Sequence, residues 1–212
     1  GVGELNQVYS FADKHGLRVI EDAAHAFGTQ YLGVRVGGIG DVTCFSFDGI
    51  KNITSGEGGC IVSDDKGLLD KIRDARLLGV EKDTDNRYLG KRSWNFDVSS
   101  QGWRYHMSDI MAAIGIQQLK RFNVFADRRQ SLARKYDKLL SNSPNIKLLN
   151  NNYYEVVPHI YIVQLNESLN RDNIIQLLNN EGIQAGIHYL PNHLLSYYAY
   201  NAGIKNTESI YQ

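Results

Sequence analysis

The chain has 212 residues, 42% of them hydrophobic and 22% charged, which is an ordinary composition for a protein with one large core or two modest ones. Its 23 basic and 23 acidic residues give a net charge of zero, so the charge does not indicate binding to nucleic acid or to an anionic membrane surface. No apolar run approaches the roughly 20 residues that cross a bilayer. We therefore expect a cytoplasmic protein that binds neither nucleic acid nor membrane.

The first part of the chain alternates a helix, a glycine and short apolar segments. Residues 4–15 carry apolar side chains at helical spacing, and Gly16 follows as a natural C-cap. Short apolar strands are predicted at residues 17–20, 42–47 and 59–63. This order is typical of an α/β protein with a parallel sheet, in which ligands bind at the carboxyl ends of the strands.

The second part of the chain is predicted to contain two helical segments separated by irregular chain. Asp64 or Asp65 can cap a helix that runs to about Leu78, residues 79–104 form an irregular excursion, and Ser108 can cap a long helix to about residue 141. The polar residues 142–152 indicate a boundary. A strand, a helix and a strand are then predicted at residues 159–165, 171–182 and 183–189, which together predict a second, smaller domain.

A single lysine, Lys51, follows the predicted strand 42–47 in a loop of small residues such as Gly49, Ser55 and Gly56. Most lysines are solvated at the surface, which is the simpler interpretation. The alternative is a lysine that forms a Schiff base with a carbonyl cofactor. Such an amine reacts only when it is unprotonated, and partial burial favours that form. Small neighbours would leave room for a flat ring.

Three other side chains near strand ends are compatible with the same chemistry. Asp22 could pair with the pyridine nitrogen of pyridoxal phosphate, whose protonated ring acts as an electron sink, although such an acidic residue is more often a turn former. Ser46 could bind a phosphate, or could simply alternate within its strand. His25 could stack on the ring or contact its phenolic oxygen, or could pack locally.

Other site types lack their sequence signatures. The chain has no G-x-x-x-x-G-K-[ST], no G-x-G-x-x-G between a strand and a helix, and no G-x-S-x-G. It has no H-E-x-x-H and no paired C-x-x-C, so no metal site is predicted. The two cysteines, Cys44 and Cys60, lie in apolar strand-like runs and are predicted to be reduced core residues.

Several segments together resemble the fold-type I, pyridoxal-phosphate-dependent sugar aminotransferases of the DegT/DnrJ/EryC1/StrS family. The most specific block contains "EDAAHA.G" and "FSF…KNIT.GEGG". The matching pieces are residues 21–28, 33–41, 45–59, 102–119, 128–139 and 182–193. The resemblance implies a large domain with a partial mixed or parallel sheet, residues 1–125, and a small α+β C-terminal domain, residues 126–212, entered through a long helix.

The resemblance also assigns roles to the candidate residues around the cofactor. Lys51 stands where relatives carry the lysine that binds pyridoxal phosphate covalently. Asp22 matches the carboxylate that pairs with the pyridine nitrogen, and His25 matches a residue that lies against the ring or its phenolic oxygen. Ser46 matches a phosphate ligand.

Further residues are implicated at the edge of the site. In many relatives a segment like "GYNYRMSD" crosses a dimer interface toward the partner's cofactor phosphate, and here Arg104 of "GWRYHMSD" stands at the position of its asparagine. His188 and His193 match residues that line the sugar pocket. A homodimer is expected, with residues 87–107 at the interface, although this segment could also be an ordinary surface loop.

The resemblance implies an aminotransferase that moves an amino group from glutamate to a nucleotide-linked keto-sugar, best matched by a UDP-linked 4-keto sugar. A sugar dehydratase of the same fold would carry histidine in place of Lys51, and a non-catalytic sugar-nucleotide-binding relative would not need Lys51, Asp22 and Ser46 intact. Because family members extend further at both ends, the chain is expected to be a fragment that lacks part of the phosphate cradle.

Overall fold

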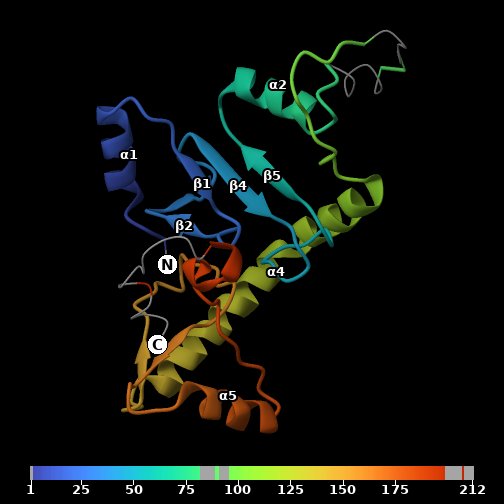
Figure 1. Ribbon diagram of the computed structural model, residues 1–212. Helices are drawn as coiled ribbons and strands as arrows, with labels where there is room; N and C mark the ends of the chain where they lie inside the picture. Colours follow the sequence, from blue (N-terminus) through green and yellow to red (C-terminus); the bar gives the residue numbers. More distant parts are fainter. Residues whose placement is uncertain (1, 82–88, 91–95, 199–206, 208–212) are drawn as a thin grey trace. The chain divides into compact units, whose positions relative to one another are not determined.

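The computed structural model describes residues 2–81, 89–90, 96–198 and 207, and it is a mixed α/β fold, as the sequence predicts (Figure 1). Its contacts divide the chain into two compact units. The first comprises Gly1–Ser143 and Leu148–Val163, and the second comprises Pro144–Lys147 and Gln164–Gln212.

The first unit is built on a three-stranded sheet in the order β1–β4–β5. Its strands are β1 (Ile20–Asp22), β4 (Val42–Ser46) and β5 (Gly59–Val62). β1 and β4 are parallel, whereas β4 and β5 are antiparallel, so the sheet is mixed. A separate antiparallel pair consists of β2 (Gln30–Tyr31) and β3 (Val34–Arg35). The first strand begins at Ile20, where the predicted strand ended, so Asp22 is the last residue of β1 rather than a residue beyond it.

The helices of the first unit are α1 (Leu5–Lys14), α2 (Lys66–Ala75) and α4 (Asp109–Leu140). Each has the terminal residue that the sequence predicts. Gly16 follows α1 with φ +62°, a conformation that glycine adopts without strain. Asp65 caps α2 and Ser108 caps α4, each accepting a hydrogen bond from a backbone N–H in the first turn. The capping pattern therefore fixes where both helices begin.

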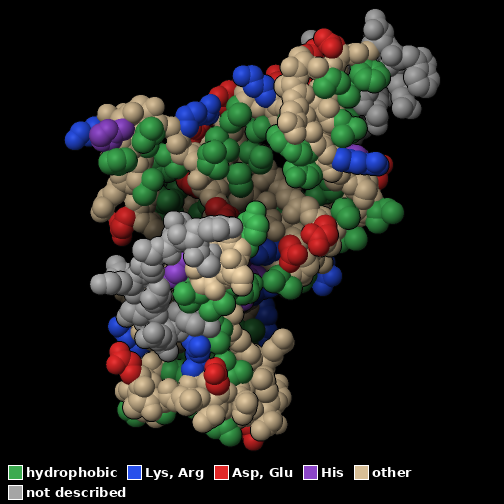
Figure 2. Space-filling view, viewed as in Figure 1, with side chains coloured by type: hydrophobic (Ala, Val, Ile, Leu, Met, Phe, Trp, Pro, Cys, Tyr) green, Lys and Arg blue, Asp and Glu red, His purple; other side chains and the backbone are tan. Residues whose placement is uncertain are grey.

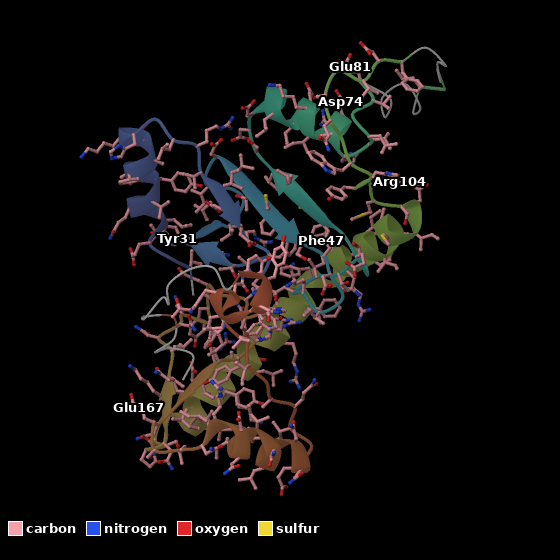
Figure 3. All side chains as sticks on the ribbon, viewed as in Figure 1. Tyr31, Phe47, Asp74, Glu81, Arg104 and Glu167 are labelled. Carbon is pink, nitrogen blue, oxygen red and sulfur yellow. The ribbon has the colours of Figure 1, made fainter. Side chains whose placement is uncertain are left out.

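Phe27 joins the turn after β1, the end of β4 and the helix α4. Its ring meets the rings of Phe45, Phe47 and Phe122 edge to face, with centroid distances of 5.3, 5.8 and 5.0 Å. Figure 3 shows Phe47 at the end of β4. Phe122 belongs to a buried cluster with Ile53, Ala126 and Val157. Edge-to-face contacts restrict ring orientation as well as bury area, so this cluster fixes the loop after β4 against α4.

Part of the sheet surface carries exposed apolar side chains. Ile20, Ile61 and Val62 are 72%, 41% and 38% exposed. Figure 2 shows hydrophobic side chains gathered over β1, β4 and β5 on the visible face. Sheets that contain parallel strands are normally covered on both faces. This sheet therefore presents a surface suited to further packing.

The second unit contains α5 (Arg171–Asn180) and two 3₁₀ turns, η1 (Asn192–Leu194) and η2 (Ser196–Tyr198). A two-stranded sheet of β6 (Ile146–Leu148) and β7 (Val163–Leu165) crosses the boundary between the units. The stretch 142–152, read from the sequence as a boundary, contains the points where the chain passes between the two units, after Ser143 and after Lys147, and it also contains β6. One prediction is wrong here, because residues 183–189 are not a strand. Because β6 pairs with β7, the predicted β-α-β piece does not form.

The irregular segment after α2 is anchored at its two ends. Isolated bridges join Leu77 to Arg104 and Val80 to Val98, while residues 87, 88 and 91–95 of the expected interface segment lie outside the described residues. The expected domain boundary at residue 125 falls inside α4, and the contact-based division places all of α4 in the first unit. Within the described ranges, no helix is both long and apolar enough to cross a membrane.

Candidate active site

Lys51 lies in a tight loop between β4 and β5. The backbone N–H groups of Phe47 and Ser55 donate to Gly58 O (2.8 Å) and Phe47 O (2.9 Å), and the Lys51 N–H donates to Asp48 O (3.1 Å). The Lys51 side chain is half-buried. The loop therefore holds the base of the side chain while its amine remains reachable, so the amine is not a freely solvated surface group.

The small residues of this loop have packing roles of their own. Ser55 is fully buried, and its hydroxyl donates to Glu57 O at 2.7 Å. A Cβ at Gly59 would lie 2.4 Å from Phe45 O, a separation that real Cβ atoms essentially never show. Glycine is therefore required there for β5 to approach β4. The structure thus explains these two residues by packing rather than by space for a cofactor ring.

The structure brings Lys51 and His25 together. Lys51 Nζ lies 2.7 Å from His25 Nε2. This distance is that of a hydrogen bond, in which a lysine ammonium donates to the ring nitrogen and a neutral lysine amine can donate or accept, according to the histidine tautomer. His25 reaches the lysine from the turn after β1, in which Ala26 N donates to Ala23 O. The contact gives the Lys51 amine a proton partner inside the site.

Asp22 and Ser46 lie at the same edge of the sheet. Each is the last residue of its strand, and in the parallel pair Asp22 is opposite Cys44, two residues before Ser46. Asp22 Oδ1 accepts from Ala24 N (3.1 Å), and Ser46 Oγ accepts from Asp48 N (3.4 Å). Burial and, second, the Asp22 carboxylate raise the pKa of the Cys44 thiol. Both polar side chains are therefore placed at the edge where parallel strands bind ligands.

A cavity of about 510 Å³ opens beside Asp22, within the first unit, and neither Ser46 nor Lys51 lines it. Asp22 and His25 line it, together with small and apolar side chains such as Ala23 and Ala26. Its volume is within the range of small-molecule sites. His159, from the segment after β6, also lines this cavity, and its ring stacks on that of His25.

The other candidate residues are Arg104, His188 and His193. Arg104 is exposed, its backbone bridges Leu77, and Figure 3 shows it beside the start of α4. His188 and His193 belong to the second unit, where the His188 ring meets Tyr189 edge to face and His193 lies in η1. The structure therefore brings Lys51 and His25 into contact, aligns Asp22 and Ser46 on one edge, and leaves the roles of these three residues as predictions.

Two side chains that the sequence did not single out connect distant parts of this site. Asn52 is 3% exposed, and its Nδ2 donates to Phe27 O (3.2 Å) and Val157 O (3.0 Å). His159 stacks on His25 with a centroid distance of 4.1 Å and an interplanar angle of 24°. The sequence could have pointed to Asn52 through one feature, its place directly after the lysine of a partly buried loop. No local pattern marks His159, because its contact is made 134 positions from its partner.

The donor set suits a flat aldehyde cofactor that carries a phosphate. Lys51 would bind the aldehyde carbon, Asp22 would accept a hydrogen bond from the protonated ring nitrogen, and Ser46 would donate a hydrogen bond to the phosphate. The cavity beside Asp22 and His25 has room for such a ring. Over residues 2–81, 89–90, 96–198 and 207, the structure gathers no group of three His, Cys, Asp or Glu side chains that could hold a metal ion.

Comparison with known proteins gives a consistent result. The DegT/DnrJ/EryC1/StrS aminotransferase family matches residues 1–212. The spore coat polysaccharide biosynthesis protein SpsC of Bacillus subtilis is 36% identical over 219 residues, which cover 97% of this chain and 54% of that protein. The chain spans about half the length of the curated relatives it matches.

Solved structures share the fold at lower identity. Helicobacter pylori PseC, an aminotransferase involved in the biosynthesis of pseudoaminic acid, is 28% identical with a TM-score of 0.88, over 99% of this chain and 56% of that one. The PLP-form of the sugar aminotransferase Spr1654 from Streptococcus pneumoniae is 26% identical with a TM-score of 0.86, over 100% of this chain and 58% of that one.

Proposed function

We propose that this chain, which belongs to the DegT/DnrJ/EryC1/StrS aminotransferase family, carries the lysine-bearing part of a pyridoxal-phosphate-dependent sugar aminotransferase. The observation that supports it most is the Lys51 amine held 2.7 Å from His25, at the sheet edge that also carries Asp22 and Ser46. An amine, a carboxylate and a hydroxyl so placed match the needs of that cofactor. A solvated surface lysine would have no reason for such a partner.

The proposed reaction transfers an amino group from glutamate to a nucleotide-linked keto-sugar, in the first instance a UDP-linked 4-keto sugar. Two similar proteins support a sugar as the substrate class, since SpsC is named for polysaccharide biosynthesis and PseC for the biosynthesis of pseudoaminic acid. We place the enzyme in the cytoplasm as a homodimer, with residues 87–107 at the interface. The exposed rings of Trp103 and Tyr105, 47% and 76% accessible, support that surface.

Bound pyridoxal phosphate supplies an electron sink that stabilises the negative charge left when a proton leaves the substrate carbon. Lys51 Nζ would take that proton as a general base and give it back as a general acid. Backbone hydrogen bonds of the loop, Lys51 N to Asp48 O and Ser55 N to Phe47 O, fix the base of the lysine side chain.

His25 and Asp22 act on the two sides of this step. His25 Nε2, 2.7 Å from Lys51 Nζ, is hydrogen-bonded to the amine and keeps it directed into the site. Asp22, whose Oδ1 is fixed by the Ala24 N–H, holds a proton on the ring nitrogen by charge. In the dimer, Arg104 is proposed to reach the partner's phosphate, and His188 and His193 to contact the sugar.

Reductive trapping tests the lysine assignment directly. The purified protein is incubated with pyridoxal phosphate, reduced with borohydride, digested and mapped by mass spectrometry. We expect the cofactor mass on the peptide that contains Lys51. Lys51→Ala should abolish both the label and the visible absorption of the bound cofactor, whereas Lys66→Ala, an exposed lysine at the start of α2, should retain them. A label that remains on other lysines in Lys51→Ala would contradict the proposal.

The substrate is tested separately with a panel of UDP-, GDP- and dTDP-linked keto-sugars and glutamate. Formation of amino-sugar with the UDP-linked 4-keto compounds, in preference to the others, is the expected result. Turnover of a different nucleotide series would correct the substrate while leaving the Lys51 assignment intact. Binding of a nucleotide sugar by a protein that never takes up the cofactor would instead support a non-catalytic relative.

A further inference from the structure

His159 lies directly behind the histidine that contacts Lys51. Its ring is stacked on His25 at 4.1 Å between centroids, and His25 Nε2 is 2.7 Å from Lys51 Nζ. The geometry points to His159 as a positioning residue that fixes the His25 imidazole against the Lys51 amine. This inference rests on the proposed function only for its effect on catalysis, since the stack itself is a property of the chain.

His25 gains an oriented ring from this stack. It follows β1 in a short turn and is exposed, so the plane of its ring matters for its contact with Lys51. An imidazole that rotates about its side-chain bonds loses the 2.7 Å contact with the amine. A flat partner at 4.1 Å and 24° permits one ring plane and excludes the others. The stack therefore fixes the orientation of the exposed His25 ring.

The backbone at His159 is held by a side chain of α4. Arg129 Nη1 donates to Pro158 O (3.2 Å) and to His159 O (3.0 Å), both in a part-buried setting. Burial also lowers the pKa of the Arg129 guanidinium. Both ring nitrogens of His159 are also buried. The backbone at residue 159 is thus fixed by a charged donor, and the ring occupies a defined position.

The same segment is tied to the lysine loop on its other side. Asn52, the residue after Lys51, donates from Nδ2 to Val157 O at 3.0 Å and to Phe27 O at 3.2 Å. Val157 N donates in turn to Thr29 Oγ1 at 3.0 Å. The lysine loop is therefore hydrogen-bonded to residue 157, His159 stacks on His25, and His25 contacts the Lys51 amine. The His159 ring therefore meets the site through His25, while its backbone segment is joined to the lysine loop through Asn52.

The test reads the His25 ring directly by NMR in the cofactor-free protein. The chain has six histidines, so their imidazole resonances can be assigned from single His→Gln variants. In the native stack the His25 ring protons are shielded by the ring current of His159. We expect His159→Ala to move them to unshielded positions and His159→Phe, which restores a flat ring, to keep them shielded. His15→Ala, which removes a histidine whose ring is tilted against Phe11 at 4.4 Å and 40°, should leave them unchanged.

Catalysis supplies the second measurement. In the half-reaction with the amino donor, His159→Ala should slow the proton-transfer step about tenfold to a hundredfold with little change in donor affinity, and His159→Phe should restore most of the rate. Unmoved His25 resonances in a folded His159→Ala protein, or displaced resonances in folded His159→Phe, would overturn the inference. A protein that never takes up the cofactor at Lys51 would refute the proposed function while leaving the NMR result valid.

Discussion

Replacing Asn52 should strongly lower the free energy of unfolding of the first unit. Its side chain is 3% exposed, and its Nδ2 donates to two backbone carbonyls, Phe27 O at 3.2 Å and Val157 O at 3.0 Å. The two acceptors belong to segments far apart in the sequence. Replacing Asn52 with alanine removes both donors and leaves two carbonyls in a site that water reaches poorly. The amide therefore connects the turn after β1 with the segment before β7.

The cost follows from those contacts. An unsatisfied buried carbonyl costs about 1–3 kcal/mol, so two of them predict a loss of about 2–6 kcal/mol. Asn52 Oδ1 is buried and has no hydrogen-bond partner among the described residues, so its removal offsets part of this cost. We expect Asn52→Ala to lower the free energy of unfolding by about 2–4 kcal/mol. Asn52→Asp, which replaces the donor with an acceptor that faces two carbonyls, should cost at least as much.

Equilibrium urea unfolding followed by far-UV circular dichroism measures this difference, with the free energy extrapolated linearly to water. Asn123→Ala is the matched control, because it makes the same substitution at an exposed position of α4 and should stay within about 0.5 kcal/mol of the native protein. A loss below about 1 kcal/mol in Asn52→Ala, with an unchanged urea dependence, would refute the assignment of these two hydrogen bonds.

Two further substitutions test the packing around the sheet. Burial and the hydrogen bond to Glu21 raise the pKa of Tyr9 from 10.0 to about 12, so the stability that the protonated phenol contributes is complete below pH 10 and is lost between about pH 10 and 12. Tyr9→Phe should therefore lose less stability than the native protein between pH 9 and 11.5 in urea titrations, and an equal loss would contradict the shift. Gly59→Ala would place a Cβ 2.4 Å from Phe45 O and should destabilise the protein by about 1–3 kcal/mol, whereas Gly3→Ala, which has no atoms within 4 Å, should be neutral in the same titration.

The site could be predicted in part because its key residues stand at the ends of strands that the sequence marks clearly. The apolar runs before Asp22 and Lys51 predict two strands, and adjacent parallel strands bring their carboxyl ends to one edge. The resemblance to a family then assigned Lys51, Asp22, His25 and Ser46 to named roles. The structure supplied a contact that no pattern predicts, the 2.7 Å approach of His25 to Lys51.

The second unit shows where pattern alone fails. Residues 183–189 alternate apolar and polar side chains like a strand, yet β7 pairs with β6, which lies in a stretch whose asparagines indicate a loop. A strand exists only where a partner supplies hydrogen bonds. Local composition does not contain that information, so the pairing had to be decided by the fold.

The sequence by itself determined the mixed α/β class, the caps at Asp65 and Ser108, and the lysine after a buried strand, because these depend on residues close together in the chain. Only the tertiary structure decided that Asn52 bonds to Val157, 105 positions away, and that His159 stacks on His25. These contacts depend on where α4 and the segment before β7 pack against the lysine loop. That placement is a collective result of burying Phe27, Phe122 and their neighbours, which no single stretch of sequence encodes.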